Sequence, residues 1–414
     1  MTIFETLESQ VRSYSRSWPA VFDRAVGSWM YDEDGKAYLD FFGGAGALNY
    51  GHNNPLFKRV LIEYLERDSV THGLDMNTVA KRAFLETFQE KILRPRGYDY
   101  KVQFPGPTGA NSVESALKLV RKVTGRESII NFTNAFHGMT LGALSVTGNS
   151  MKRGGAGIPL VHATPMPYDN YFDGKTPDFL WFEKLLLDSG SGLNEPAAVI
   201  VETVQGEGGL NIARFEWLRA LSELCKRHDM LLIVDDVQMG CGRTGPFFSF
   251  EYAEIQPDIV TLSKSIGGYG MPMALTLIKP ELDVWEPGEH NGTFRGNNPA
   301  FVTATCAIDE YWSDDRLEKA TLAKGEQVNE ALDAIADRHR GLTVRGRGLA
   351  KGLAFQQTEL AGKVCKAVYD RGLLMETAGP SDEVAKMLPP LTTTEDEFAQ
   401  GLAILSDAVD AVCS

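Results

Sequence analysis

The chain has 414 residues, of which 43% are hydrophobic and 23% charged, the balance of a soluble globular protein larger than one ordinary domain. A net charge of −14 argues against a nucleic-acid-binding protein, which would need basic surface to meet phosphates. No apolar run approaches the roughly 20 residues that a membrane span requires. Five dispersed cysteines without a CxxC pair, and an N-terminus without a signal-peptide pattern, predict a cytoplasmic protein with free thiols.

The first predicted element is a β-hairpin over Trp29–Asp40, with Asp34–Gly35 as its turn. The middle of the chain then alternates short apolar runs with amphipathic helices such as Phe215–His228. The predicted strands are Ser128–Phe132, Ala197–Glu202, Leu231–Asp235, Ile259–Ser263 and Met273–Ile278. This alternation predicts an α/β fold with a mostly parallel sheet that helices cover on both faces.

The C-terminal part reads differently, with a long helical stretch after about residue 313, a short strand near Leu342–Arg345 and a final helix from Thr394. We therefore expect a large α/β domain over residues 56–312. A smaller α+β domain would combine residues 1–55 with residues 313–414, so that both chain ends contribute to it.

Ligands of open parallel sheets bind beyond the carboxyl ends of the strands, so the residues that follow each apolar run are the candidates for chemistry. Asp235 ends one predicted strand, and a buried carboxylate there needs a partner such as a protonated ring nitrogen. Lys264 follows the next strand, where desolvation would favour the neutral amine that forms imines. A carboxylate that caps a turn and a surface lysine are the alternatives for each residue alone. The pair at two strand ends favours the chemical interpretation.

Two further segments support a site at this edge. Thr108, Gly109 and Ala110 open a predicted helix, whose free N–H groups and dipole suit an anion, although a plain N-cap explains the same residues. Phe136 and His137 follow the Ser128–Phe132 strand, where an aromatic ring can stack on a planar cofactor and the histidine can position its neighbours. A core phenylalanine and a hydrogen-bonded structural histidine are the ordinary alternatives.

Other catalytic classes lack their motifs in this sequence. The seven histidines are dispersed, and neither HxxxH nor a Cys/His cluster predicts a metal site. The chain also has no GxxxxGK[ST] loop, no GxGxxG after a strand and no GxSxG.

Taken together, the motifs resemble those of the class III aminotransferases, which have fold type I and depend on pyridoxal 5′-phosphate. The segments that carry the resemblance span nearly the whole chain: YLDFFGGAGALNYGHNNP (Tyr38–Pro55), TGANSVESALKLVRKVTGR (Thr108–Arg126), ETVQGEGG (Glu202–Gly209), DDVQMGCGRTG (Asp235–Gly245), SKSIGGYGMP (Ser263–Pro272), TFRGNNP (Thr293–Pro299), VRGRGLAKGL (Val344–Leu353) and PPL (Pro389–Leu391).

The resemblance implies a role for each matching residue. Lys264 would hold the coenzyme covalently and Asp235 would pair with its ring nitrogen. The other cofactor-binding positions are Thr108, Gly109 and Ala110 for the phosphate, Phe136 and Val237 for the ring faces, His137 and Glu202 for orientation, Gln238 for the ring hydroxyl, and Thr293 for the phosphate of a neighbouring subunit. A homodimer, or a homotetramer built from dimers, is therefore expected.

Within the family, the segments LDFFGGAGALNYGHNNP, AFHGMTLGALSVTGN and EHNGTFRGNN resemble the members that begin ectoine biosynthesis. The expected substrates are thus L-glutamate and L-aspartate 4-semialdehyde. Ala45 is predicted to line their pocket, and Glu207 to pair with Lys386, which stands where relatives usually have arginine and offers a point charge in place of a bidentate fork. Another class III ω-aminotransferase, a racemase or decarboxylase, and a non-catalytic binding protein are the alternatives.

Overall fold

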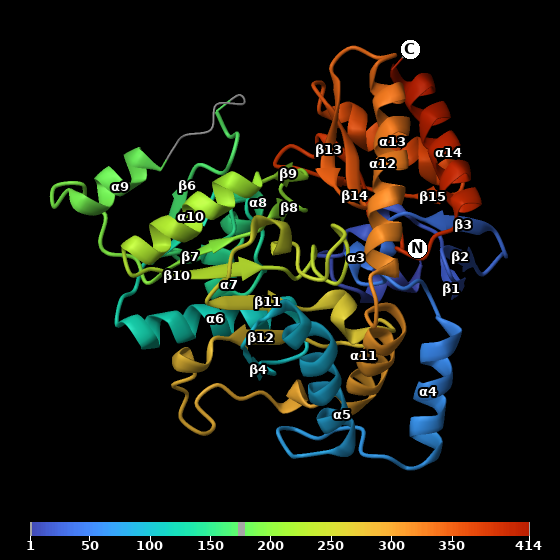
Figure 1. The fold of residues 1–414 in the computed structure, drawn as a ribbon. Coiled ribbons are helices and arrows are strands. Elements are labelled where there is room, and N and C mark those ends of the chain that lie inside the picture. The colour runs from blue at the N-terminus through green and yellow to red at the C-terminus, as the bar shows by residue number, and fades with distance from the viewer. Residues whose placement is uncertain (1, 173–178, 414) are drawn as a thin grey trace.

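A computed structural model of the protein describes residues 2–172 and 179–413 (Figure 1). Within these residues the largest sheet has seven strands, and all but β12 run in the same direction. In sheet order the strands are β4 (Lys101–Gln103), β12 (Leu275–Ile278), β11 (Ile259–Leu262), β10 (Leu231–Asp235), β7 (Ala198–Val201), β5 (Ile129–Phe132) and β6 (Ala163–Met166). The predicted α/β fold with a mostly parallel sheet is confirmed.

Side chains of the central strands alternate between two apolar cores. Ile233 of β10 packs with residues of α6 (Gly109–Thr124), whereas Leu232 and Val234 pack with those of α10 (Phe215–Arg227). Figure 1 shows α6 on one side of the sheet and α10 on the other. Burial on both faces explains why these strands read as continuous apolar runs in the sequence.

Two small sheets are formed near the chain ends, and one of them combines strands from both ends. One contains β1 (Phe22–Val26), β2 (Trp29–Asp32), β3 (Ala37–Asp40) and β15 (Leu373–Leu374); the other contains β13 (Leu342–Arg347), β14 (Ala350–Phe355), β17 (Val384–Met387) and β16 (Glu376–Ala378). Because β15 pairs in parallel with β3, the N-terminal and C-terminal segments lie side by side, as Figure 1 shows. The residue limits of the two expected domains remain a prediction.

The remaining elements connect these sheets. The α-helices are α1 (Ile3–Leu7), α2 (Tyr14–Ser17), α3 (Gly43–Gly46), α4 (Pro55–Glu66), α5 (Val79–Phe88), α7 (Leu141–Ser145), α8 (Ser150–Gly154), α9 (Leu180–Leu187), α11 (Asn298–Tyr311), α12 (Arg316–Ala336), α13 (Glu359–Asp370) and α14 (Glu395–Cys413). Short helical turns are η1 (Gln89–Leu93), η2 (Arg94–Arg96), η3 (Glu251–Ala253), η4 (Lys264–Gly267), η5 (Pro280–Leu282) and η6 (Thr293–Arg295), and a two-stranded ribbon joins β8 (Val204–Gln205) to β9 (Asn211–Ile212). In the part of the chain described, no helix is both long and apolar enough to cross a membrane.

Candidate active site

The carboxyl ends of four neighbouring strands bring the predicted residues together. β11, β10, β7 and β5 are adjacent in the sheet and parallel, so their following residues emerge at one edge. Lys264 lies just beyond β11, Asp235 ends β10, Glu202 follows β7, and the loop after β5 carries Phe136 and His137. Residues that are far apart in the sequence therefore lie together in a single cluster.

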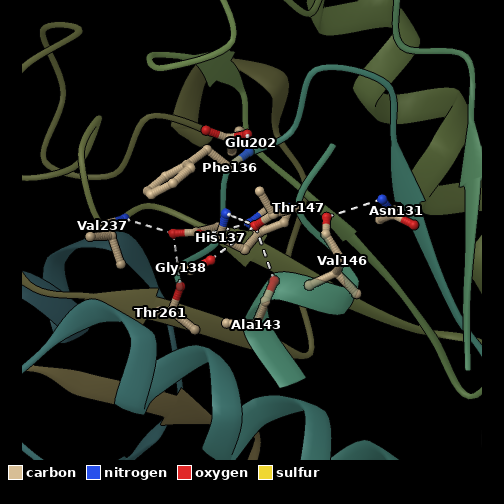
Figure 2. A network of polar contacts seen from close by, with 11 residues as sticks. Asn131, Phe136, His137, Gly138, Ala143, Val146, Thr147, Glu202, Val237 and Thr261 are labelled. Carbon is tan, nitrogen blue, oxygen red and sulfur yellow. Dashed lines mark hydrogen bonds and ion pairs between the residues drawn. The ribbon is translucent and has the colours of Figure 1, made fainter. Parts of the chain in front are cut away.

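Asp235 is held by contacts with three residues, Val237, Thr261 and His137, which Figure 2 labels. Its Oδ1 accepts hydrogen bonds from the backbone N–H of Val237 and the hydroxyl of Thr261, both at 3.1 Å. Its Oδ2 lies 2.7 Å from Nδ1 of His137. The carboxylate is only 6% exposed. These contacts satisfy a buried carboxylate and fix the direction in which its free lone pairs point.

The loop after β5 is itself fixed by side-chain hydrogen bonds (Figure 2). The hydroxyl of Thr147 accepts from the backbone N–H of His137 at 3.0 Å, and the amide of Asn131 donates to the Val146 carbonyl at 3.0 Å. Nε2 of His137 is buried and has no hydrogen-bond partner among the residues described. The His137 ring thus contacts the Asp235 carboxylate, and its positioning role remains a prediction.

Glu202 reaches the same loop from β7. Its Oε2 accepts a hydrogen bond from the backbone N–H of Phe136 at 3.0 Å. Burial and the neighbouring Asp235 carboxylate raise the pKa of Glu202 well above its ordinary value. Glu202 therefore fixes the Phe136 backbone, whereas its predicted influence on Gln238 remains a prediction.

Lys264 has a left-handed backbone, with φ of 53°, at the start of η4. Its Nζ donates to the backbone carbonyl of Ala45 at 2.8 Å. Burial lowers the pKa of Lys264 to about 8, even though Glu207 opposes the shift. At pH 7 roughly a tenth of the amine is therefore in the neutral form that a nucleophile requires, far more than for an ordinary lysine.

The Ala45 carbonyl owes its direction to an unusual turn. Gly43, Gly44, Ala45 and Gly46 all have positive φ values, between 55° and 79°. A Cβ on Gly43 would also lie 2.4 Å from the Leu388 carbonyl oxygen. Only a glycine-rich segment tolerates four such residues in a row, so the sequence GGAG is needed to aim this carbonyl at Lys264.

Gln238 links the lysine to a second charged group. Its Nε2 donates to the Ala45 carbonyl and to Oε1 of Glu207, both at 3.0 Å. Glu207 Oε1 also accepts from Lys386 Nζ at 2.7 Å. The predicted pairing of Glu207 with Lys386 is therefore present, and it lies two hydrogen bonds away from the carbonyl that holds Lys264.

Lys386 is completely buried on β17 and contacts two carboxylates. Besides Glu207, Oε1 of Glu376 lies 3.0 Å from its Nζ. Burial alone would lower the pKa of Lys386, but the two carboxylates raise it, so the ammonium stays charged. Burial would likewise raise the pKa of Glu207, yet Lys386 and Lys264 hold it at about 2.

The N-terminus of α6 closes another side of the cluster. Thr108 is its N-cap, with Oγ1 accepting from the Asn111 N–H at 3.3 Å, which is the ordinary alternative for this residue. Gly109 and Ala110 begin the helix, where backbone N–H groups lack intrahelical partners by geometry. A Cβ on Gly109 would meet Cγ1 of Val237 at 2.8 Å, so the glycine lets the start of the helix approach Val237 closely.

These groups fit the coenzyme that the sequence resemblance implies. The start of α6 suits a phosphate, the buried carboxylate of Asp235 suits a protonated ring nitrogen, and the amine of Lys264 suits covalent attachment. Phe136 and Val237 come from separate loops of the same cluster, as the two faces of a planar ring would require (Figure 2).

One predicted residue lies elsewhere, and two contributors were missed. Thr293 is exposed at the start of η6, outside the hydrogen-bonded cluster, as expected if it serves a neighbouring subunit. Thr261, the penultimate residue of β11, was hidden within an apolar run. Glu376 faces Lys386 across the β16–β17 pair, and no sequence motif marks it.

Comparisons with known proteins match the whole chain. The family model described as aminotransferase class-III matches residues 11–409. The diaminobutyrate–2-oxoglutarate transaminase of Streptomyces avermitilis is 69% identical over 99% of this chain and 97% of that protein, and that of Virgibacillus pantothenticus is 56% identical over 100% and 99%. The ornithine aminotransferase of Toxoplasma gondii ME49 has a similar structure, with a TM-score of 0.85 and 26% identity over 99% of this chain and 94% of that one.

Proposed function

The chain belongs to the class III aminotransferases, which depend on pyridoxal 5′-phosphate, and on that premise we propose that it transfers the amino group of L-glutamate to L-aspartate 4-semialdehyde. The products are L-2,4-diaminobutyrate and 2-oxoglutarate, and the reaction serves ectoine biosynthesis. The observation that carries the proposal is 69% identity, over 99% of the chain, with a diaminobutyrate–2-oxoglutarate transaminase. The intact Lys264–Asp235 cluster supports a catalytic role over a binding role.

The bound coenzyme supplies an electron-withdrawing ring that stabilises negative charge at the substrate α-carbon. Asp235 would hold the ring nitrogen protonated, and its contacts with Thr261 and His137 keep the carboxylate in place. Lys264 Nζ removes the α-proton of glutamate and later returns a proton to the acceptor carbon. With a pKa near 8, this amine exchanges protons readily in both directions.

Lys386 is the cation that binds a substrate carboxylate, since it lies within the same hydrogen-bonded network as Lys264. In the structure described, the carboxylate of Glu207 is bound to the Lys386 ammonium. When glutamate enters, its carboxylate replaces Glu207 on the ammonium, and Ala45 contributes the pocket wall beside the amine.

We propose a homodimer as the minimal active unit, located in the cytoplasm. Thr293 and Phe294 stand on the surface at η6, and Phe294 is 66% exposed, as residues that meet a neighbouring subunit would be before assembly. Light scattering of the purified protein checks the assembly. A monomer with full activity would contradict the proposed role of Thr293.

A panel of amino acceptors tests the substrate assignment. The holoenzyme, first converted with L-glutamate, is offered L-aspartate 4-semialdehyde, glutamate 5-semialdehyde, N-acetylglutamate 5-semialdehyde and succinate semialdehyde. We expect kcat/KM to be highest for L-aspartate 4-semialdehyde, with L-2,4-diaminobutyrate as the product. A higher value for either glutamate-derived semialdehyde would assign an ornithine-type activity, such as the one for which the structurally similar T. gondii protein is named.

A further inference from the structure

Lys386 stands between two carboxylates that differ in how firmly the fold holds them. Glu376 and Lys386 are direct partners in the antiparallel pairing of β16 with β17, so their relative position is set by the sheet. Glu207 instead lies in the turn between β8 and β9, and its side chain is 20% exposed compared with 9% for Glu376. One carboxylate thus belongs to a paired strand, whereas the other belongs to a turn and has the more exposed side chain.

When a substrate carboxylate replaces Glu207 on Lys386, there is an intermediate state in which neither carboxylate contacts the ammonium. Lys386 is fully buried, and a buried ammonium without a counter-ion is strongly unfavourable. The other charged or titratable groups near it are Lys264, which has the same charge, and the phenol of Tyr14. Glu376, whose Oε1 lies 3.0 Å from Nζ, is therefore the remaining carboxylate beside the ammonium during the exchange; burial raises its pKa, and the charge of Lys386 opposes that shift.

We propose that Glu376 is the fixed counter-ion of Lys386, a positioning residue that allows Glu207 to leave and a carboxylate of the amino donor to enter. The inference rests on the proposed function, because it assumes that glutamate reaches Lys386. Without the charge on Glu376, the Lys386–Glu207 pair would be a simple buried ion pair, and opening it would leave a lone cation. Glu376 thus controls the rate of entry and not the chemical step at Lys264.

The test compares charge and side chain at position 376 in the holoenzyme. Glu376→Gln keeps the volume of the side chain and removes its charge. The second-order rate constant for bleaching, which is the loss of the coenzyme's visible absorbance after L-glutamate is added, should therefore fall by about tenfold or more. Glu376→Asp keeps the charge and should lose less than about threefold. Glu383→Gln, a carboxylate between β16 and β17 that lies 3.7 Å from Arg345 and not on Lys386, is the matched control.

A second background separates this role from a general structural one. In Lys386→Met there is no buried ammonium to neutralise, so adding Glu376→Gln should no longer slow the reaction with glutamate, although that reaction is slower in this background because the carboxylate-binding cation is gone. Glutarate, a dicarboxylate without an amino group, should show the same pattern in its rate of binding, followed by the change in coenzyme absorbance. Equal losses in both backgrounds, equal losses for Asp and Gln, or a wild-type rate for Glu376→Gln would overturn the inference. Failure of the wild-type holoenzyme to bleach with glutamate would instead refute the proposed function.

Discussion

Asp235 and Lys264 occupy equivalent positions at the ends of strands but have different chemical environments. Each lies at the end of a buried strand, but their partners differ. Asp235 meets an N–H, a hydroxyl and an imidazole, which suit its carboxylate, whereas the Lys264 amine meets a backbone carbonyl in a desolvated site. Local partners and burial, and not residue type alone, suit the one to the proposed role of a fixed electrostatic partner and the other to that of a proton carrier.

Asp235→Asn tests the first of these roles. The amide keeps the shape and can still meet Val237 and Thr261, but it no longer holds a ring nitrogen protonated. We expect turnover to fall on the order of a hundredfold or more, with coenzyme still bound. Steady-state rates and the coenzyme absorbance of the purified variant measure the two effects separately. Full turnover would contradict the role of Asp235.

The lowered pKa of Lys264 predicts a pH dependence that does not require turnover. With a pKa of about 8, roughly a tenth of the amine is neutral at pH 7, several hundred times the fraction for an ordinary lysine. Coenzyme-free protein should therefore react with pyridoxal 5′-phosphate faster as the pH rises toward 8, and the rate should level off above that value. Stopped-flow absorbance gives the profile. A rate that climbs without a plateau to pH 10 would show an unperturbed amine.

Elements of secondary structure explain which parts of the site the sequence could predict. The strands Leu231–Asp235 and Ile259–Leu262 are apolar on both faces, so both strands and the residues after them were visible as patterns. Strands β14, β16 and β17 were not predicted. The apolar run of β14, Ala350–Phe355, is interrupted by a lysine and a glycine, and the charged residues Glu376 and Lys386 are of the types usually found on the surface. Their burial depends on pairing across the C-terminal sheet, which no local pattern encodes.

The contacts between segments could not be predicted from local sequence patterns, for the same reason. The Ala45 carbonyl meets Lys264 across 219 positions of the chain, and Glu207 meets Lys386 across 179. Resemblance to a family suggested that Glu207 and Lys386 pair, but neither periodicity nor composition could do so. Residue types at strand ends were therefore predictable, and their partners were not.

The start of α6 offers a prediction at the scale of one element. In Gly109→Ala, the added Cβ would meet Val237 Cγ1 at 2.8 Å, and the β-branched valine has little freedom to move. We expect the dissociation constant for pyridoxal 5′-phosphate to rise by about tenfold, since displacement by a fraction of an ångström weakens a preformed phosphate site. Fluorescence titration of coenzyme-free protein measures it.

Gly154→Ala is the matched control for this change. A Cβ at Gly154, in α8, would have no heavy atom within 4 Å. Its coenzyme affinity should equal that of the wild type. Unchanged affinity in both variants would argue against coenzyme contact at the N-terminus of α6.

At the scale of the whole molecule, the site exists only where three distant parts of the chain meet. The GGAG turn comes from the N-terminal segment, Lys264 and Asp235 from the central sheet, and Lys386 from the C-terminal sheet. Arg243 joins the same three parts. Its guanidinium donates to the side-chain oxygen of Asn49 at 2.6 Å and to the carbonyls of Leu349 and Pro389 at 3.1 and 2.6 Å.

Arg243→Met should therefore destabilise the whole fold. Arg243 is fully buried, and its loss would leave two carbonyls and one amide oxygen without donors, at a cost of roughly 3 kcal/mol or more in the free energy of unfolding. Urea denaturation followed by fluorescence measures the change. Arg227→Met, at an exposed residue of α10, is the control and should stay within about 0.5 kcal/mol of the wild type. Equal stability of the two variants would show that Arg243 does not join the segments.

The most direct test of the account follows coenzyme absorbance through one complete exchange of the amino group. The holoenzyme is mixed with L-glutamate and then with L-aspartate 4-semialdehyde, with Lys264→Ala as the control. We predict that the visible band of the lysine-bound coenzyme disappears with glutamate, returns with the semialdehyde as L-2,4-diaminobutyrate forms, and is absent from the control. If the wild-type protein shows no such band after addition of pyridoxal 5′-phosphate, Lys264 does not hold the coenzyme and the account is contradicted.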